Sequence, residues 1–145
     1  MYRLIYKSKS NKVITWDQVK EIMHSSEEHN SELHVSGVLL ATSSHYLQVL
    51  EGPYETVNEI FMHIVKDPRH SDIKLVSFNA IDARIFEAWG MLGIGVFNLN
   101  KELETELKEK YGTEDDGLKF PLDEWKVLAM INDINLVSDQ PEWKM

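Results

Sequence analysis

The chain has 145 residues, of which 43% are hydrophobic and 27% are charged, a composition typical of one globular domain. The net charge is −9 and no lysine- or arginine-rich stripe is present, so direct binding to nucleic acid or to an anionic membrane is disfavoured. Cysteine is absent, which excludes disulfides, thiolate nucleophiles, iron–sulfur clusters and a covalent bond from a thiol to a flavin.

No run of apolar residues approaches the length of a membrane span. The first six residues already have a strand-like pattern and lack the long apolar stretch of a signal peptide. We therefore expect a cytoplasmic protein with no membrane association.

The first half of the chain predicts a strand, a helix and two further strands. Residues 2–8 alternate in hydrophobicity, which is typical of a strand. Thr15 and Gln18 form a capping-box signature for a helix that runs to about His29. Residues 34–42 and 45–51 then predict two strands joined by a short turn.

The second half predicts a helix, two strands and two further helices. An apolar stripe from Val57 to Val65 indicates the helix that follows Gly52-Pro53. Residues 73–80 predict a fourth strand and residues 89–97 a fifth, although three glycines weaken the fifth. The stripe of Leu103, Leu107 and Tyr111 predicts a helix that Gly112 ends, and a last helix is expected over about 122–134.

The order of these elements predicts an α+β fold, the ferredoxin-like βαββαβ sheet with a fifth strand. Both helices of that motif pack on one face of the sheet. The strand at 45–51 is apolar on both sides, so the other face needs a cover as well. We expect residues 98–145 to supply it as a C-terminal helical pair within the same domain.

Gln48 is the most informative single residue because it shares a strand face with Tyr46 and Leu50 in a strand that should be central. A buried carboxamide without partners costs about 1–3 kcal/mol, so it needs hydrogen bonds. In this topology the first and third strands are usually adjacent, which brings Tyr6 close to Gln48. The pair is either a satisfied polar couple of the core or a polar couple arranged around a ligand.

Other candidates have two readings each. Asn30 suits the end of the first helix, but its amide also matches the N3–H and C4=O edge of a flavin ring. Ile22 and Ile64 suit core packing, yet two helices on a sheet can admit a flat ring between such aliphatic side chains. Arg69, just after Pro68, could contact a ring carbonyl or a phosphate, but the residues alone favour a structural role at the helix end.

The sequence gives no sign of a metal site or of catalysis. The six histidines form no i,i+4 pair and no HExxH motif, so no metal is expected. Neither a catalytic triad nor an isolated carboxylate pair can be proposed. The glycines at 93 and 95 lack the rest of a dinucleotide-binding loop.

Read together, several segments resemble the BLUF family, the domains that sense blue light using flavin. The resemblance runs from Tyr2 to about Leu92 and gives residues 1–97 as the flavin-binding photosensor domain. Its most specific stretch is Tyr-Leu-Gln-Val-Leu-Glu-Gly at 46–52. The other matching stretches, in the family's order and spacing, are YRLIYKS (2–8), SSEEHN (25–30), VSGVLL (35–40), HIVKDPRHS (63–71) and FEAWGM (86–91).

The resemblance implies a light-driven switch of hydrogen bonds around a flavin held without a covalent bond. Tyr6 matches the tyrosine that gives an electron and a proton to the excited flavin. Gln48 matches the glutamine whose rotation or tautomerisation changes the hydrogen bonds. Trp89 and Met91 match the residues, on a strand near the C-terminal helices, that relay the change.

The resemblance also implies which residues bind the flavin. Asn30 matches the asparagine on the flavin carbonyl edge, and Ile22 and Ile64 match the residues on either side of the ring. FAD is the expected cofactor, with FMN and riboflavin as alternatives. The expected cofactor-binding set is Ile22, Ser26, His29, Asn30, Gln48, His63, Ile64, Asp67, Arg69 and His70.

The sequence departs from the family pattern at a few positions. The common Gly-Ile-Thr-Gly of the second strand is His34-Val35-Ser36-Gly37 here, and His34 adds bulk that could shift the preceding loop. His29 and His63 stand where other members carry Asn and Arg, which bears on flavin affinity more than on photochemistry.

We therefore expect a blue-light receptor and not an enzyme. Its output is expected to pass through residues 101–134 to a separate effector protein or to a change in its own oligomer. One alternative is a light-insensitive interaction module that has lost its cofactor. The other, ranked last, is an enzyme that turns over substrate with bound flavin.

Overall fold

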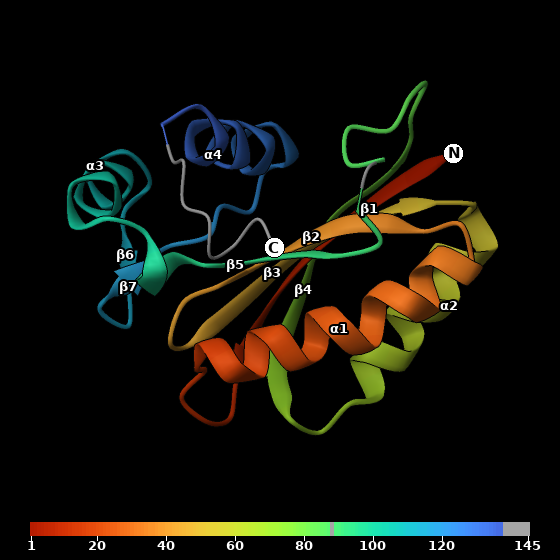
Figure 1. Ribbon diagram of the computed structural model, residues 1–145, viewed down its shortest axis with the longest axis horizontal. Coiled ribbons are helices and arrows are strands. Elements are labelled where there is room, and N and C mark those ends of the chain that lie inside the picture. Colours follow the sequence, from red (N-terminus) through yellow and green to blue (C-terminus); the bar gives the residue numbers. More distant parts are fainter. Residues whose placement is uncertain (88, 138–145) are drawn as a thin grey trace.

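The computed structural model describes residues 1–87 and 89–137 (Figure 1). The strands of the main sheet are β1 (Tyr2–Ser10), β2 (Ser36–Ala41), β3 (His45–Gly52), β4 (His70–Ala80) and β5 (Leu92–Gly95). The helices are α1 (Trp16–Glu32), α2 (Tyr54–Lys66), α3 (Lys101–Tyr111) and α4 (Glu124–Val137). A 3-10 turn, η1 (Val96–Asn98), and a small hairpin of β6 (Thr113–Glu114) and β7 (Gly117–Leu118) complete the described chain.

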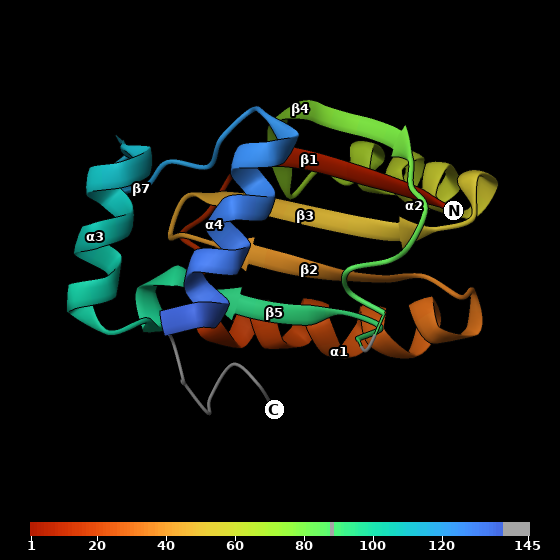
Figure 2. The same cartoon turned by 90° about the horizontal axis from the view of Figure 1, so that it is seen from above.

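The main sheet has the strand order β4-β1-β3-β2-β5. The first four strands pair antiparallel in the ferredoxin-like order, and β5 adds to the edge parallel to β2. Helices α1 and α2 lie on one face of the sheet (Figure 1), and α4 lies across the other (Figure 2). The predicted fold class is therefore confirmed.

The boundaries of α1 follow from its caps. Thr15 Oγ1 accepts the Gln18 N–H at 3.4 Å and Gln18 Oε1 accepts the Thr15 N–H at 3.1 Å, so the predicted capping box forms. The helix continues to Glu32, beyond the predicted end at about His29. His34 then adopts a φ of 58°, which turns the chain and delays the start of β2 to Ser36.

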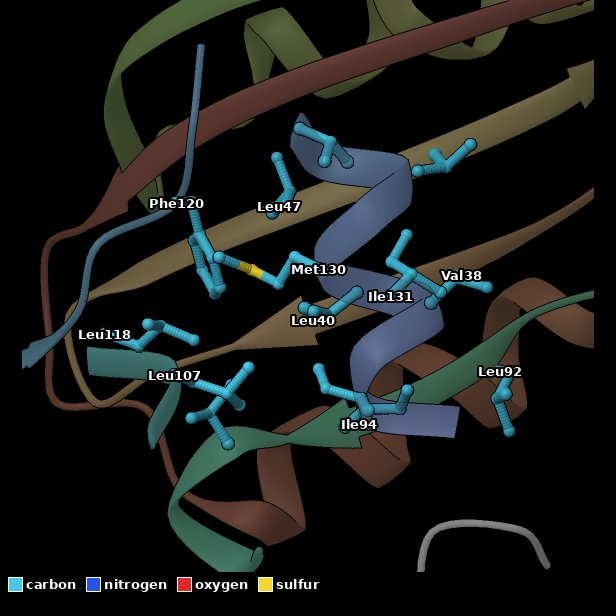
Figure 3. Close-up of a cluster of buried hydrophobic side chains, with 14 of the residues drawn as sticks. Val38, Leu40, Leu47, Leu92, Ile94, Leu107, Leu118, Phe120, Met130 and Ile131 are labelled. Carbon is cyan, nitrogen blue, oxygen red and sulfur yellow. The ribbon is translucent and has the colours of Figure 1, made fainter. Parts of the chain in front are cut away.

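Alternation along the central strands divides the interior into two cores. Leu4, Tyr6 and Leu50 face the layer of α1 and α2. Ile5, Val49 and their neighbours face α4, in a core that also takes in residues of α3 and the segment at 118–120. Figure 3 shows this second core, in which Met130 extends toward Phe120 between the helix and the sheet.

The C-terminal helices do not cover the sheet as a simple pair. Only α4 lies across the strands, whereas α3 stands at one end of the sheet beside β7 (Figure 2). The stretch at 114–117, which the sequence left as a connection, forms the β6–β7 hairpin. Asp115 and Asp116 have φ values of 51° and 64°, which the two central residues of a tight hairpin turn require. Residues 138–145 of the expected cover lie outside the described chain.

The fifth strand is shorter than expected. It contains only Leu92–Gly95, so Trp89 and Met91 precede it and Phe97 lies in the 3-10 turn. At Gly90 the chain runs close against α1, where an added Cβ would lie 2.7 Å from the Glu27 carbonyl oxygen. This close approach to the helix keeps residues 89–91 out of the strand.

Among the described helices, none combines the length and the apolar composition needed to cross a bilayer. The cytoplasmic location stays a prediction.

Candidate functional site

A cavity of about 740 Å³ lies between α1, α2 and the sheet. This volume is within the range of sites that hold a cofactor-sized ligand. Aliphatic side chains from both helices and from the sheet line it, including Ile22, Ile64, Leu39 and Leu50. Polar groups converge on it from the same elements, so the cavity combines an apolar slot with hydrogen-bonding groups.

All ten residues that the sequence assigned to a cofactor line this one cavity, and so does Tyr6. Five elements bring them together: β1, α1, β3, the end of α2 with the turn that follows, and the first residue of β4. The structure thus brings the residues together, while their contacts with a cofactor stay a prediction. The ten are Ile22, Ser26, His29, Asn30, Gln48, His63, Ile64, Asp67, Arg69 and His70.

Tyr6 and Gln48 form the polar centre of the cavity. They are directly opposed in the β1–β3 ladder, and the Tyr6 hydroxyl donates to Gln48 Oε1 at 2.5 Å. Gln48 Nε2 in turn donates to Met91 Sδ at 3.5 Å, a contact with a weak acceptor. The three side chains form a continuous series from the cavity to the segment before β5.

Tyr6 is held as a neutral phenol. Its side chain is buried, and burial, reinforced by Tyr46 and Asp67, raises the pKa of Tyr6 far above its usual value. A phenol in this state keeps its proton at every physiological pH. It can therefore donate to the amide of Gln48 as a neutral hydroxyl.

Asn30 lies at the end of α1 and is buried at the cavity wall. Its Nδ2 donates to the Gly90 carbonyl at 3.0 Å, and no described residue donates to its Oδ1. The backbone carbonyl of Asn30 accepts the N–H of Leu33 and of Val35. Asn30 therefore closes the helix with its backbone, while its side chain joins the helix to the segment before β5.

Asp67 and Arg69 pair at the mouth of the cavity. Arg69 donates to the Asp67 carboxylate from its backbone N–H, from Nε and from Nη2, the last at 2.6 Å. The hydrogen bond from Arg69 lowers the pKa of Asp67 to about 2. The Arg69 side chain is 78% exposed, so it can leave this pair at low cost and contact a ligand.

His70 has a structural role in addition to its place on the cavity wall. Its Nε2 lies 2.7 Å from the Ile64 carbonyl oxygen and its Nδ1 lies 2.8 Å from Ser8 Oγ. A carbonyl only accepts, so Nε2 carries a proton and donates to it, and Nδ1 exchanges a hydrogen bond with the serine hydroxyl. Both ring nitrogens are therefore engaged in joining the end of α2 to β1.

The sequence missed the end of β1 and the loop after it as part of the cavity. Ser10, Asn11 and Lys12 line it, and Asn11 Nδ2 donates to the Pro68 carbonyl at 2.6 Å. Gln18, Glu21, Ser25 and Tyr46 also line the cavity and were not predicted as part of it. A lysine just past the strand that carries Tyr6 was the one available signal for this loop.

The two residues expected to relay the change occupy different positions. Met91 is buried beneath Gln48. Trp89 is 37% exposed, and neither residue lines the cavity. What fixes Trp89 is its backbone, because its carbonyl accepts the Gly37 N–H at 3.1 Å. An added Cβ at Gly37 would lie 2.0 Å from the Val49 carbonyl oxygen, so only glycine permits this approach of β2 to β3.

No group of three or more histidine, aspartate or glutamate side chains among the described residues could hold a metal ion.

Comparisons with known families and relatives point to one group. The family model described as sensors of blue-light using FAD matches residues 1–92. The blue light- and temperature-regulated antirepressor BluF of Escherichia coli (strain K12) is 34% identical over 96 residues, which are 66% of this chain and 23% of that protein. The photoactivated adenylate cyclase subunit beta of Euglena longa is 29% identical over 85 residues, 59% of this chain and 10% of the relative.

Solved structures give the same result over nearly the whole chain. The photo-activated state of BlsA has a TM-score of 0.77 at 25% identity, with 96% of each chain covered. The dark-state structure of BlrB, described as a BLUF protein, has a TM-score of 0.73 at 26% identity and covers 94% of this chain and 96% of its own.

Proposed function

The chain belongs to the BLUF family of sensors of blue light using flavin, and we propose on that basis that it is a blue-light receptor that switches the hydrogen bonds of Gln48. The observation that carries the proposal is the series from Tyr6 through Gln48 to Met91 beside a cavity of cofactor size. A satisfied core pair would not need a cavity next to it. A ligand bound in the cavity would lie beside the pair and respond to a change in its hydrogen bonds.

The residues of the cavity fit a flavin. Its ring needs a flat apolar slot, for which Ile22 and Ile64 stand on the two helices, and its N3–H needs an acceptor, which Asn30 Oδ1 offers. FAD is the cofactor we propose, in line with the description of the family model. Lys12 and Arg69 near the mouth would meet the charged end of a phosphorylated tail.

A bound flavin supplies the absorption of blue light and a strongly oxidising excited state. Tyr6 is the electron and proton donor because its phenol is neutral, buried and hydrogen-bonded to Gln48. With a flavin bound as electron acceptor, Gln48 would receive the proton of that hydrogen bond as the electron leaves Tyr6. Return of both the proton and the electron to Tyr6, after the Gln48 amide has rotated or changed tautomer, would restore the neutral phenol. The new orientation replaces the donor that Gln48 presents to the cavity and alters its contact with Met91.

The output is proposed to leave through residues 101–134 toward a separate effector or a second copy of the chain. The names of the relatives associate the matching region with an antirepressor and with adenylate cyclases. The chain spans 23% of the first and 10% of the second, so we transfer neither activity to it and assign it no enzymatic reaction.

The deciding experiment is an absorption spectrum of the purified protein before and after blue light. We expect a flavin spectrum with a small red shift that reverses in the dark. Gln48→Leu keeps the size of the side chain and removes both hydrogen bonds, so it should bind flavin and show no shift. Met62→Leu, an exposed change on α2, is the matched control and should shift as the wild type does.

A protein that stays colourless after incubation with FAD, FMN and riboflavin would overturn the proposal. A normal red shift in Gln48→Leu would leave flavin binding established and overturn the proposed role of Gln48.

A further inference from the structure

The sheet carries a second buried polar group, on the face away from the cavity. Glu51 is three residues after Gln48 on β3 and is fully buried. Arg3 on the neighbouring β1 donates to Glu51 Oε2 from Nε at 2.9 Å, and its Nη2 lies in ion-pair contact with the same oxygen at 2.9 Å. Nothing in the switch described above uses this pair.

The other oxygen of Glu51 holds the chain that leads to Met91. Its Oε1 accepts the N–H of Ile85 at 3.0 Å and the N–H of Phe86 at 2.8 Å. The Phe86 side chain is buried in the core beneath α4, and the Phe86 carbonyl accepts the N–H of Trp89 at 3.3 Å. The Glu51 carboxylate therefore holds residues 85 and 86 directly and residue 89 through the Phe86 carbonyl.

The segment is then fixed twice more before it reaches the switch. The Trp89 carbonyl accepts the Gly37 N–H of β2, and the Gly90 carbonyl accepts a hydrogen bond from Asn30 Nδ2 of α1. Met91 follows at once, with its sulfur 3.5 Å from Gln48 Nε2. A weak contact of this length depends on where the backbone places the methionine. Glu51 contributes to that position because it anchors residues 85 and 86, where the segment leading to Met91 begins.

The same charge group reaches the C-terminal helix. Arg3 Nη1 lies 3.5 Å from Glu124 Oε1 in the first turn of α4, and Glu124 Oε2 accepts from Asn79 of β4 at 3.1 Å. One arginine therefore touches both the carboxylate that fixes the Met91 segment and the start of α4.

We propose that Glu51 is a positioning residue of the light switch, which sets Met91 against Gln48 and joins that segment through Arg3 to α4. The proposal rests on the proposed photoreceptor function. Three N–H donors converge on Glu51, one each from Arg3, Ile85 and Phe86, and the charged Arg3 Nη2 lies beside them. Only a carboxylate, which accepts at both oxygens, satisfies all three.

Glu51→Gln tests this role because it keeps the shape and replaces one acceptor with a donor. The new NH₂ group of the glutamine must then face another donor, either the Arg3 side chain or the backbone N–H groups of residues 85 and 86. We expect flavin binding and a red shift to remain, and the return to the dark state to be about tenfold faster, the factor that one weakened charged hydrogen bond gives. The measurement is the decay of the light-minus-dark absorption difference in the flavin-bound protein.

Glu114→Gln is the matched control. Glu114 pairs with the buried Lys7 on the same face of the sheet, and the ion pairs of its carboxylate, with Lys7 and His45, involve none of residues 85–87 or 89–91. Its recovery should stay within about twofold of the wild type. A role in stability alone would lower the thermal midpoint of both variants and leave both recovery rates unchanged, which would overturn the proposal.

A double variant shows whether Glu51 acts through Met91. Because the effect is expected to pass through the methionine, Glu51→Gln added to Met91→Ala should change the recovery little beyond Met91→Ala alone. Additive effects would overturn this route. If Glu51→Gln fails to fold, Glu51→Asp keeps the charge for Arg3 but shortens the reach to residues 85 and 86, and the same acceleration is expected from it.

The outcomes separate the two proposals. A wild-type protein without a red shift overturns both. A wild-type shift together with an unchanged recovery in the Glu51 variants overturns only the positioning role.

Discussion

His34 is a non-glycine residue in the left-handed region, with a φ of 58°, at a position where the family pattern expects glycine. A side chain costs about 1–2 kcal/mol there, whereas glycine adopts the conformation freely. His34→Gly should therefore leave the free energy of unfolding unchanged or raise it by up to about 1 kcal/mol, measured by urea denaturation.

His24→Gly is the control for that change, since His24 lies on the exposed face of α1, away from both helix ends. The same replacement should cost a few tenths of a kcal/mol, roughly 0.3–0.5, in a helix, because histidine is itself a weaker helix former than alanine. Equal losses in the two variants would show that the backbone at His34 carries no strain.

At the residue scale, the sequence pointed to the site better than to its relay. Tyr6 and Gln48 could be paired from alternation and topology, since opposed residues on adjacent central strands must meet. Trp89 could not be placed because its position depends on a backbone bond to Gly37 and on the packing of Gly90 against α1. Such contacts join segments about 50 to 60 residues apart and leave no local pattern.

At the scale of elements, the β6–β7 hairpin is fastened to the sheet by a buried ionic group. Lys7 Nζ lies 2.7 Å from Glu114 Oε1 and donates to the Phe120 carbonyl at 3.0 Å. His45 Nε2 lies 3.7 Å from the same glutamate oxygen, and His45 Nδ1 lies 2.7 Å from Ser44 Oγ. Lys9 and Asp115 form an outer ion pair beside it.

Because of this ionic group, we expect the free energy of unfolding to fall in mild acid. Burial lowers the pKa of His45, and Lys7 and Lys9 lower it further against the opposing charges of Glu114 and Asp115. The unfolded chain therefore takes up a proton near pH 6.5 that the folded chain does not. The stability that neutral His45 gives is complete above that pH and is lost as the pH falls, by at most about 1.4 kcal/mol per pH unit.

Urea denaturation at pH 5, 6 and 7 measures this slope. His45→Gln removes the titrating group and should flatten the slope, whereas His24→Gln on the exposed face of α1 should leave it unchanged. Identical slopes for His45→Gln and the wild type would exclude His45 as the source.

The elements themselves were mostly readable from local signals. The capping box of α1 and the glycine that ends α3 are both present, with Gly112 at a φ of 94°. The hairpin at 113–118 was not predicted because two-residue strands carry too little alternation to be seen. The shorter fifth strand follows from close packing of glycines, which the sequence shows only as a weaker strand signal.

At the scale of the molecule, light should change the C-terminal segment at 101–134 although the cavity lies on the opposite face of the sheet. The expected route runs from Gln48 through residues 85–91 and Arg3 to α4. Under continuous blue light we expect faster amide hydrogen exchange within residues 101–134 than in the dark. Gln48→Leu should show no difference between light and dark.

Changes confined to residues 1–97 would reject this segment as the output. The same measurement tests whether residues 98–137 act as one domain with the sheet, which we propose because α4 and the strands share a core.

The sheet separates a cofactor side from an output side, and successive residues of a strand belong to opposite sides. Evolution can therefore alter the two sides almost independently within one short stretch of sequence. Among relatives with different effectors, we expect the even positions of β1 and β3, such as Tyr6 and Gln48, to be kept. The apolar odd positions, such as Ile5 and Val49, should vary together with the helix that covers them, whereas Arg3 and Glu51 should be kept with the switch. An alignment that places this variation on the even positions would show that the cofactor side, too, has been fitted to the effector.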